Sequence, residues 1–275
     1  MSFENFKLRV CVVRVGFVLL LLFSAGVVTH PLEDAAWKEV KHRMPGSLRM
    51  ENLEPALGQG LVLGIFGGFR SLMGDIFFIQ GYSSWEKRNA EKMQEKFRLA
   101  TSVSPDLLFF WLNWARMVGY DLPIWRIYER GGFDAVPDSI QKRLKQEDAL
   151  KALRILDEAE LYHPNHYKIA LERAFFYMER IDNKEIAAEW FLQASLMEGV
   201  PHYAARLHAR MLEDIGEQEK AHAFLCNLLP TLSATDPQAA RVAVLERIRE
   251  LEEELDTPFY ARLPLQPEER GPLNP

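Results

Sequence analysis

The residues of this chain that could do chemistry are its histidines and a set of helical glutamates. His163 and His166 form an H-x-x-H pair, a spacing that can supply two nitrogen ligands to a zinc ion. Pro164 between them marks a turn between helices, and neither H-E-x-x-H nor a nearby acidic ligand completes the site. The sequence therefore favours turn and surface histidines, and we expect no metal.

The glutamates could act as catalytic carboxylates, because an exported all-helical enzyme can cleave cell-wall glycan with one buried glutamate. The candidates, all on predicted helices near aromatic residues, are Glu172, Glu179, Glu189 and Glu198. Solvated helix faces explain most glutamates, however. The chain also has no G-x-S-x-G elbow and no local serine, histidine and aspartate grouping that suggests a triad. We therefore expect no catalytic residues, and an envelope enzyme acting on glycan is the alternative.

The glycine-rich stretch from Gly60 to Glu86 raises the question of a phosphate-binding loop. Gly58, Gly60 and Gly64 give G-x-G-x-x-x-G, one residue longer than the dinucleotide-binding spacing, and no predicted strand precedes them. The pattern G-x-x-x-x-G-K-[ST] is absent. We expect no cofactor.

Two charged residues argue against a second membrane helix in the same stretch. Arg70 and Asp75 would each cost about 2.5 to 3.5 kcal/mol at the centre of a bilayer. Gly60, Gly64 and Gly68 instead fall on one strip of a helix, which predicts close approach of another helix. Because Arg70 and Asp75 are five residues apart and do not face each other, we predict that each forms a structural ion pair elsewhere. A contact with a membrane surface or a partner is the alternative.

The elements that must position these residues are predicted by a recurring pattern. An apolar residue is followed by another four residues later, by an alanine three after that and by a proline five further on. Steps of four and three place side chains on one helical face, the alanine admits a neighbouring helix, and the proline can start a new helix. The two clearest copies are Met93, Phe97, Ala100 and Pro105, and Ala152, Leu156, Ala159 and Pro164.

On these residues the chain resembles the tetratricopeptide repeat superfamily, whose 34-residue unit is a pair of antiparallel helices. The resemblance covers residues 74–254 in about four copies, the third with a one-residue slip before its second helix. It places small residues at Gly81, Ala115, Ala174, Ala187, Ala194 and Ala221, aromatic residues at Trp111, Tyr177 and Phe191, and a turn at Gly216. Asp236 and Pro237 are expected to start a final capping helix. The resemblance implies an all-α, right-handed solenoid of about four helix pairs.

The stretch from Gly67 to Arg70, GGFR followed by Asp75, is also loosely similar to membrane-tethered bacterial proteins of this repeat type. That resemblance implies a shared scaffold and no activity. Arrays of this superfamily bind extended peptides or helices on the concave wall formed by the first helix of each repeat. Carried onto this sequence, the implied partner-binding residues are Tyr82, Trp85, Arg116, Tyr120, Lys168, Phe175, Arg206 and Arg210. Aromatic and arginine side chains at these positions could hold an acidic or aromatic tail.

About 25 residues are inserted in the second repeat if its core has the usual length. The insertion, residues 121–145, is predicted to extend the first helix, to turn at Gly131 and Gly132, and to form a short helix before the regular second helix. Its aromatic residues, among them Trp125 and Phe133, could form a binding lip or fill a gap in the stack.

Residues 1–30 contain an apolar segment, Val15 to Val28, preceded by Lys7, Arg9 and Arg14. Three interpretations are open: an uncleaved signal anchor, a cleaved signal peptide and a buried soluble helix. The basic flank predicts that the amino terminus stays in the cytoplasm. The remainder would then be exported, either anchored to the inner membrane on the periplasmic side or, after cleavage, periplasmic or secreted.

The composition sets the remaining expectations. The 275-residue chain has a net charge of −6 with both signs interspersed, which disfavours nucleic acid as a partner. Cys11 and Cys226 are too few and too far apart for a disulfide framework. We expect residues 31–56 to be a juxtamembrane spacer, 57–255 the repeat domain and 256–275 a proline-rich tail.

The sequence as a whole predicts a tethered scaffold for a protein or peptide partner at the bacterial envelope. A structural subunit of a membrane assembly, in which the glycine strip packs on a partner's membrane helix, is a further alternative to the enzyme.

Overall fold

The computed structural model describes residues 69–264, and the regular elements in this range are all helices. The predicted all-α class is therefore confirmed for these residues. The predicted signal anchor (1–30), the spacer (31–56), the glycine strip before Phe69 and the end of the tail lie outside the described residues. Within residues 69–264, no helix combines the length and the hydrophobicity that crossing a membrane requires.

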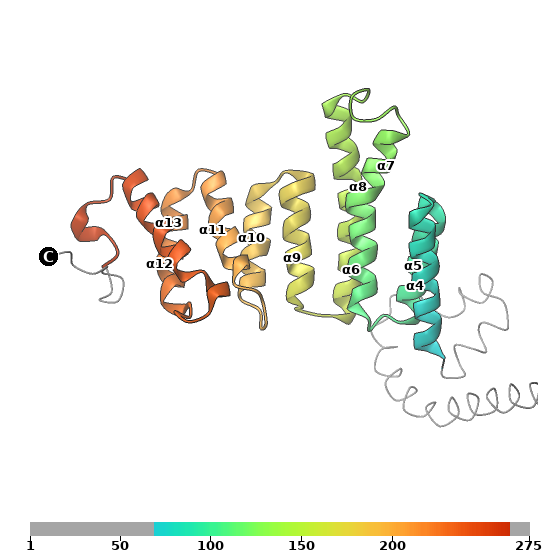
Figure 1. Cartoon of the computed structure of the whole chain (residues 1–275), viewed down its shortest axis with the longest axis horizontal. Helices are drawn as coiled ribbons and strands as arrows, with labels where there is room; N and C mark the ends of the chain where they lie inside the picture. The colour runs from blue at the N-terminus through green and yellow to red at the C-terminus, as the bar shows by residue number, and fades with distance from the viewer. Residues whose placement is uncertain (1–68, 265–275) are drawn as a thin grey trace, which may run out of the picture. The chain divides into compact units, whose positions relative to one another are not determined.

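The described chain forms two compact units, and Figure 1 labels their helices. Unit 1 comprises residues 69–126 and 154–164, and unit 2 comprises residues 127–153 and 165–264. The unit 1 helices are α4 (Arg70–Glu86), α5 (Ala90–Val103), α6 (Leu108–Arg116), the π-helical turn η3 (Met117–Asp121) and most of α7 (Leu122–Tyr128). The long helix α8 (Asp138–Tyr162) begins in unit 2 and ends in unit 1.

In unit 1, α4 packs closely on α5 because glycines replace side chains at the contact. Gly74 and Gly81 are buried, and a Cβ atom at Gly81 would lie 3.1 Å from the ring of Phe97. The repeat pattern on α5 faces this contact, since Met93, Phe97 and Ala100 are all fully buried. Position 81, which the repeat resemblance assigns to a small residue, is therefore one where the two helices are in close contact.

The proline turn after α5 is held by two side chains from other parts of unit 1. The carbonyl oxygen of Pro105 accepts hydrogen bonds from Trp111 Nε1 at 2.9 Å and from His163 Nε2 at 3.0 Å. Trp111 also stacks on Tyr162, with ring centroids 5.7 Å apart. His163 therefore has a structural contact in the turn, as the sequence favoured.

Unit 2 continues with helices that each pack on the next along the chain (Figure 1). They are α9 (Tyr167–Phe176), the π-helical turn η4 (Tyr177–Ile181), α10 (Lys184–Ser195), α11 (Tyr203–Asp214), α12 (Gln218–Leu228) and α13 (Arg241–Glu254). Their first core cluster is built on the repeat alanines, with Ala174, Ala187 and Ala194 fully buried around Phe191. Gly216, with φ +85°, forms the predicted turn between α11 and α12.

The π-helical turn η4 explains the one-residue slip in the third repeat. A π turn holds one residue more than an α turn. The extra residue falls between Ala174 on α9 and Ala187 on α10, where the sequence pattern loses its register. Both alanines remain fully buried, so the slip is absorbed by the backbone and the packing face is kept.

The insertion differs from its prediction in one respect. The first helix is extended, because α6, η3 and α7 run without a break from Leu108 to Tyr128, and Gly131 and Gly132 turn the chain with positive φ. The expected separate short helix is replaced by the single 25-residue helix α8. The reason is that the sequence contains no glycine or proline between Asp138 and His163.

The C-terminal end also differs from the expectation. Asp236 caps the short 3-10 turn η6 (Pro237–Ala239), accepting a hydrogen bond from Gln238 N at 2.9 Å, and α13 starts only after Ala240, which has a left-handed backbone conformation. Residues 257–264 then fold back onto α13, where Leu263 N donates to Glu252 Oε1 at 2.6 Å. The first part of the predicted tail is therefore ordered structure.

Candidate functional site

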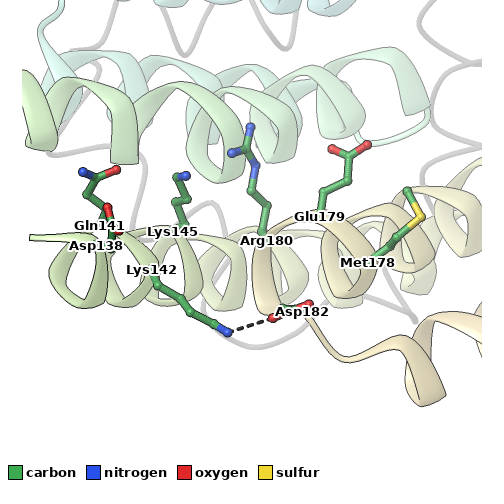
Figure 2. A pocket seen from close by; sticks show the side chains of 8 residues that line it. All are labelled: Asp138, Gln141, Lys142, Lys145, Met178, Glu179, Arg180 and Asp182. Atoms are coloured by element: carbon green, nitrogen blue, oxygen red, sulfur yellow. Dashed lines mark hydrogen bonds and ion pairs between the residues drawn. The ribbon is translucent and has the colours of Figure 1, made fainter. Parts of the chain in front are cut away.

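A cleft of about 310 Å³ lies in unit 2 between the first turns of α8 and the π-helical turn η4 (Figure 2). Its side chains come from two segments far apart in the sequence. Helix α8 contributes Asp138, Gln141, Lys142 and Lys145, and the segment around η4 contributes Met178, Glu179, Arg180 and Asp182. The α8 residues belong to the insertion, so the insertion builds one wall of the cleft.

The α8 wall is fixed by packing and by one buried amide. Ile127, Val136 and Leu144 form a small buried cluster that joins the turn after α7 to the first part of α8. Gln141 Nε2 donates to the carbonyl oxygens of Phe133 at 2.9 Å and Val136 at 2.8 Å. These contacts hold the turn 129–137 against α8 and set the position of the cleft's α8 side chains.

The opposite wall is shaped by the end of the π turn. Asp182 follows η4 with φ +62°, a left-handed conformation that aspartate tolerates better than most residues. Asn183 then starts α10, because its side chain accepts a hydrogen bond from Ile186 N at 3.0 Å. Gln146 Nε2 donates to Ile181 O at 3.0 Å and ties α8 to this turn.

An exposed ion pair joins the two walls. Lys142 Nζ lies 2.7 Å from Asp182 Oδ2, the contact drawn as a dashed line in Figure 2. The hydrogen bond and the charge of Lys142 hold the pKa of the Asp182 carboxyl below its usual range. The ion pair orients the two side chains across the cleft and contributes little to the stability of the fold, because both groups are exposed.

The remaining charged groups extend on the other side of the two helices. Figure 2 shows Lys145, Arg180 and Glu179 pointing away from the Lys142 and Asp182 pair. Lys145 Nζ lies 6.0 Å from the ring centroid of Phe133, a half-exposed aromatic residue of the insertion. Cations and a carboxylate therefore stand beside the apolar Met178, an arrangement suited to holding a charged peptide segment.

Of the eight partner-binding residues predicted from the sequence, four lie in unit 1 and four in unit 2, and none of them lines the cleft. In unit 1 the structure brings three aromatic or acidic groups together. Tyr82 packs on Trp85 with ring centroids 5.1 Å apart, and Trp85 Nε1 donates to Asp121 Oδ2 at 2.7 Å. Arg116 is exposed and Tyr120 is half-buried.

In unit 2 the two predicted arginines are engaged within the fold. Arg206 donates to the carbonyl oxygens of Gln238 at 3.3 Å and Ala239 at 3.1 Å. Arg210 Nε lies 3.1 Å from Asp214 Oδ1 on the same helix. Both guanidinium groups thus have oxygen acceptors within unit 2, while the side chain of Arg210 is still 64% exposed.

The other two predicted residues of unit 2 differ in exposure. Lys168 is exposed, with its Nζ 6.0 Å from the Tyr167 ring centroid. Phe175 packs edge-on against the buried Phe191, with centroids 5.3 Å apart, and so supports the core. The role of all eight residues in partner binding stays a prediction.

The predicted structural ion pairs have different outcomes. Arg70 Nε donates to the carbonyl oxygen of Val103, and its guanidinium lies 3.9 Å from Asp106. Asp75 is exposed, and no ion pair involves it among residues 69–264. Arg70 is therefore bound within unit 1, while an ion pair of Asp75 stays a prediction.

Sequence reasoning missed the cleft although it found both of its parts. The insertion at 121–145 and the register slip after Ala174 were each visible as departures from the repeat pattern. What was not visible is that the added turns of α8 meet the π turn that absorbs the slip.

Comparison with known proteins adds little to this description. No protein-family model matches the chain, and no curated protein is significantly similar to it. Among solved structures, the crystal structure of MamA protein is similar, with 13% sequence identity over 73% of this chain and 100% of that chain and a TM-score of 0.28. A similarity of this size supports no conclusion about function.

Proposed function

We propose that the chain is a membrane-tethered scaffold that holds a protein segment in the cleft between α8 and η4. The observation that supports this proposal is the origin of the cleft's charged side chains. The insertion (121–145) in one helix pair and the π turn η4 in the next supply charges of both signs to the same cleft. The insertion is not needed for stacking, since Ala152, Leu156 and Ala159 in the regular part of α8 are already fully buried. We further propose that the helix pairs continue as one right-handed, tetratricopeptide-like solenoid.

Tethering and export rest on the sequence of residues 1–30. The basic residues Lys7, Arg9 and Arg14 before the apolar segment favour an anchor in the inner membrane with the helical units on the periplasmic side. We therefore infer that the partner is a protein of the bacterial envelope. Cell fractionation tests this part: the full chain should sediment with membranes, and a chain lacking residues 1–30 should not.

Photo-crosslinking in cells tests the cleft itself. A photoreactive amino acid replaces Glu179 in the cleft, and the matched control replaces Glu189, an exposed residue of α10 in the same unit. We expect a protein adduct from position 179 only. The captured protein, once purified, should bind the full chain at least tenfold more weakly when Lys145 is changed to Glu.

Two results would reject the proposal. The first is equal crosslinking from positions 179 and 189, which would mean that the cleft has no particular partner. The second is cleavage of cell-wall glycan by the full chain, if changing one of the helical glutamates to glutamine abolishes that cleavage. This result would favour the enzymatic alternative.

A further inference from the structure

Two aromatic side chains are almost fully exposed at the C-terminal end of unit 2. Phe259 and Tyr260 are each 90% exposed, and they belong to the 3-10 turn η7 (Phe259–Ala261). Large aromatic residues usually contribute to cores or to the centres of protein interfaces. Two such residues exposed together on one turn are therefore a candidate contact site.

The turn that carries them is held in place by hydrogen bonds to side chains of α13. Glu252 is fully buried, and its Oε1 accepts a hydrogen bond from Leu263 N at 2.6 Å. Arg249 bonds the other carboxylate oxygen at 2.6 Å and also donates to Leu263 O at 2.6 Å. Arg262 Nε closes the segment by donating to Thr257 O at 3.0 Å. A turn held this way loses little conformational entropy on binding, so its aromatics are pre-organised for a partner.

The segment that carries the turn has an excess of negative charge, since positions 241–264 contain six carboxylates and four arginines. Each arginine between positions 241 and 262 donates a hydrogen bond within unit 2, and these residues are Arg241, Arg247, Arg249 and Arg262. Glu253 and Asp256, which precede the turn in the sequence, are exposed and form no ion pair within the described part of the chain. An anionic lipid surface would repel these carboxylates, whereas a basic protein surface would attract them.

The size of the aromatic pair indicates how it would be used. Two such side chains bury roughly 300 to 500 Å² together, which is less than the roughly 800 Å² that each partner contributes to a standard interface. A dimer of this chain held only by the two turns would therefore be too small. The pair suits the role of central anchors with an acidic rim around them.

We propose that Phe259 and Tyr260 anchor a protein partner that offers an apolar pocket bordered by lysine or arginine side chains. This surface shares no residue with the cleft between α8 and η4. Its test is therefore independent of the test of the proposed function.

The experiment begins with photo-crosslinking of the full chain in cells. A photoreactive amino acid replaces Tyr260, and the control replaces Val242, which is 69% exposed on α13 and lies away from the turn. We expect a protein adduct from position 260 and none from 242. An adduct with a second copy of this chain, with lipid, or with residues 265–275 of the same molecule would overturn the proposal, as would the absence of any adduct.

The captured protein is then purified and titrated against variants of the full chain. Phe259→Ala should weaken binding at least tenfold, while Val242→Ala should leave it unchanged. Changing Asp256 to Lys, or raising the salt concentration from 50 to about 500 mM, should weaken binding several-fold because the rim is electrostatic. Thermal unfolding checks that the variants are folded. A captured protein whose affinity responds to neither Phe259→Ala nor salt would refute the inference.

Discussion

Glu252 offers the sharpest test of how the C-terminal end of unit 2 is stabilised. Its buried carboxylate receives one backbone and one guanidinium hydrogen bond, each at 2.6 Å, from Leu263 and Arg249. In Glu252→Gln the side chain keeps one acceptor oxygen and must turn an NH₂ group toward the other donor. Because a hydrogen bond to a charged group contributes about 1.5 to 3 kcal/mol, we expect a loss of about 2 kcal/mol.

Hydrogen exchange of the full chain measures this loss at the place where it occurs. A local loss of about 2 kcal/mol corresponds to roughly 30-fold faster exchange of the amides in residues 257–263. Glu253→Gln is the matched control, since Glu253 is the next residue on α13 and is exposed. Equal exchange in the wild type and in Glu252→Gln would refute the reasoning, and so would an equal effect of Glu253→Gln.

The same carboxylate predicts a dependence on pH. Burial raises the pKa of Glu252, but the hydrogen bonds from Leu263 N and Arg249 and the nearby charges outweigh it, so the pKa lies below its usual range. The groups that face it are Arg249 on α13 and His222 on α12, whose Nε2 lies 3.7 Å from Oε1, with Cys226 next to His222. The stabilisation is therefore complete above the usual pKa of 4.5 and is lost as the pH falls through the lowered value. The difference between the wild type and Glu252→Gln should shrink over that acidic range.

Three further predictions concern the core and two other titrating groups. Phe191→Ala should lower the free energy of unfolding, measured by urea denaturation, by about 3 to 5 kcal/mol because Phe191 is fully buried. The control Leu196→Ala should change it by less than about 0.5 kcal/mol, because Leu196 is 75% exposed. Lys142→Ala should raise the pKa of Asp182 toward its usual range, as followed by NMR of the carboxyl carbon, and an unchanged pKa would mean that the ion pair does not form in solution. Burial lowers the pKa of His208 more than its backbone hydrogen bond raises it. The free energy of unfolding should therefore decrease as the pH falls below 6.5, and His208→Gln should remove this pH dependence.

The helical elements could be predicted from the sequence because their signals are local. Steps of four and three residues fix which side chains share a helical face, and Phe97, Ala100, Leu156 and Ala159 are all fully buried as a result. Glycine and proline mark the turns, as at Gly216 with its positive φ, because backbone conformation at these residues depends little on distant contacts. For the same reason the slip after Ala174 was visible as a break in spacing.

The site could not be predicted from those signals because it depends on distances between segments. Whether Lys142 meets Asp182, forty residues away, is decided by how far α8 extends and where η4 ends. Arg206 likewise meets the carbonyl oxygens of Gln238 and Ala239, 32 and 33 residues further along the chain, only because the fold brings them to α11. The sequence by itself therefore determined the helices, their buried faces and their turns, while the tertiary structure alone decided which charged side chains meet and which of them face the solvent.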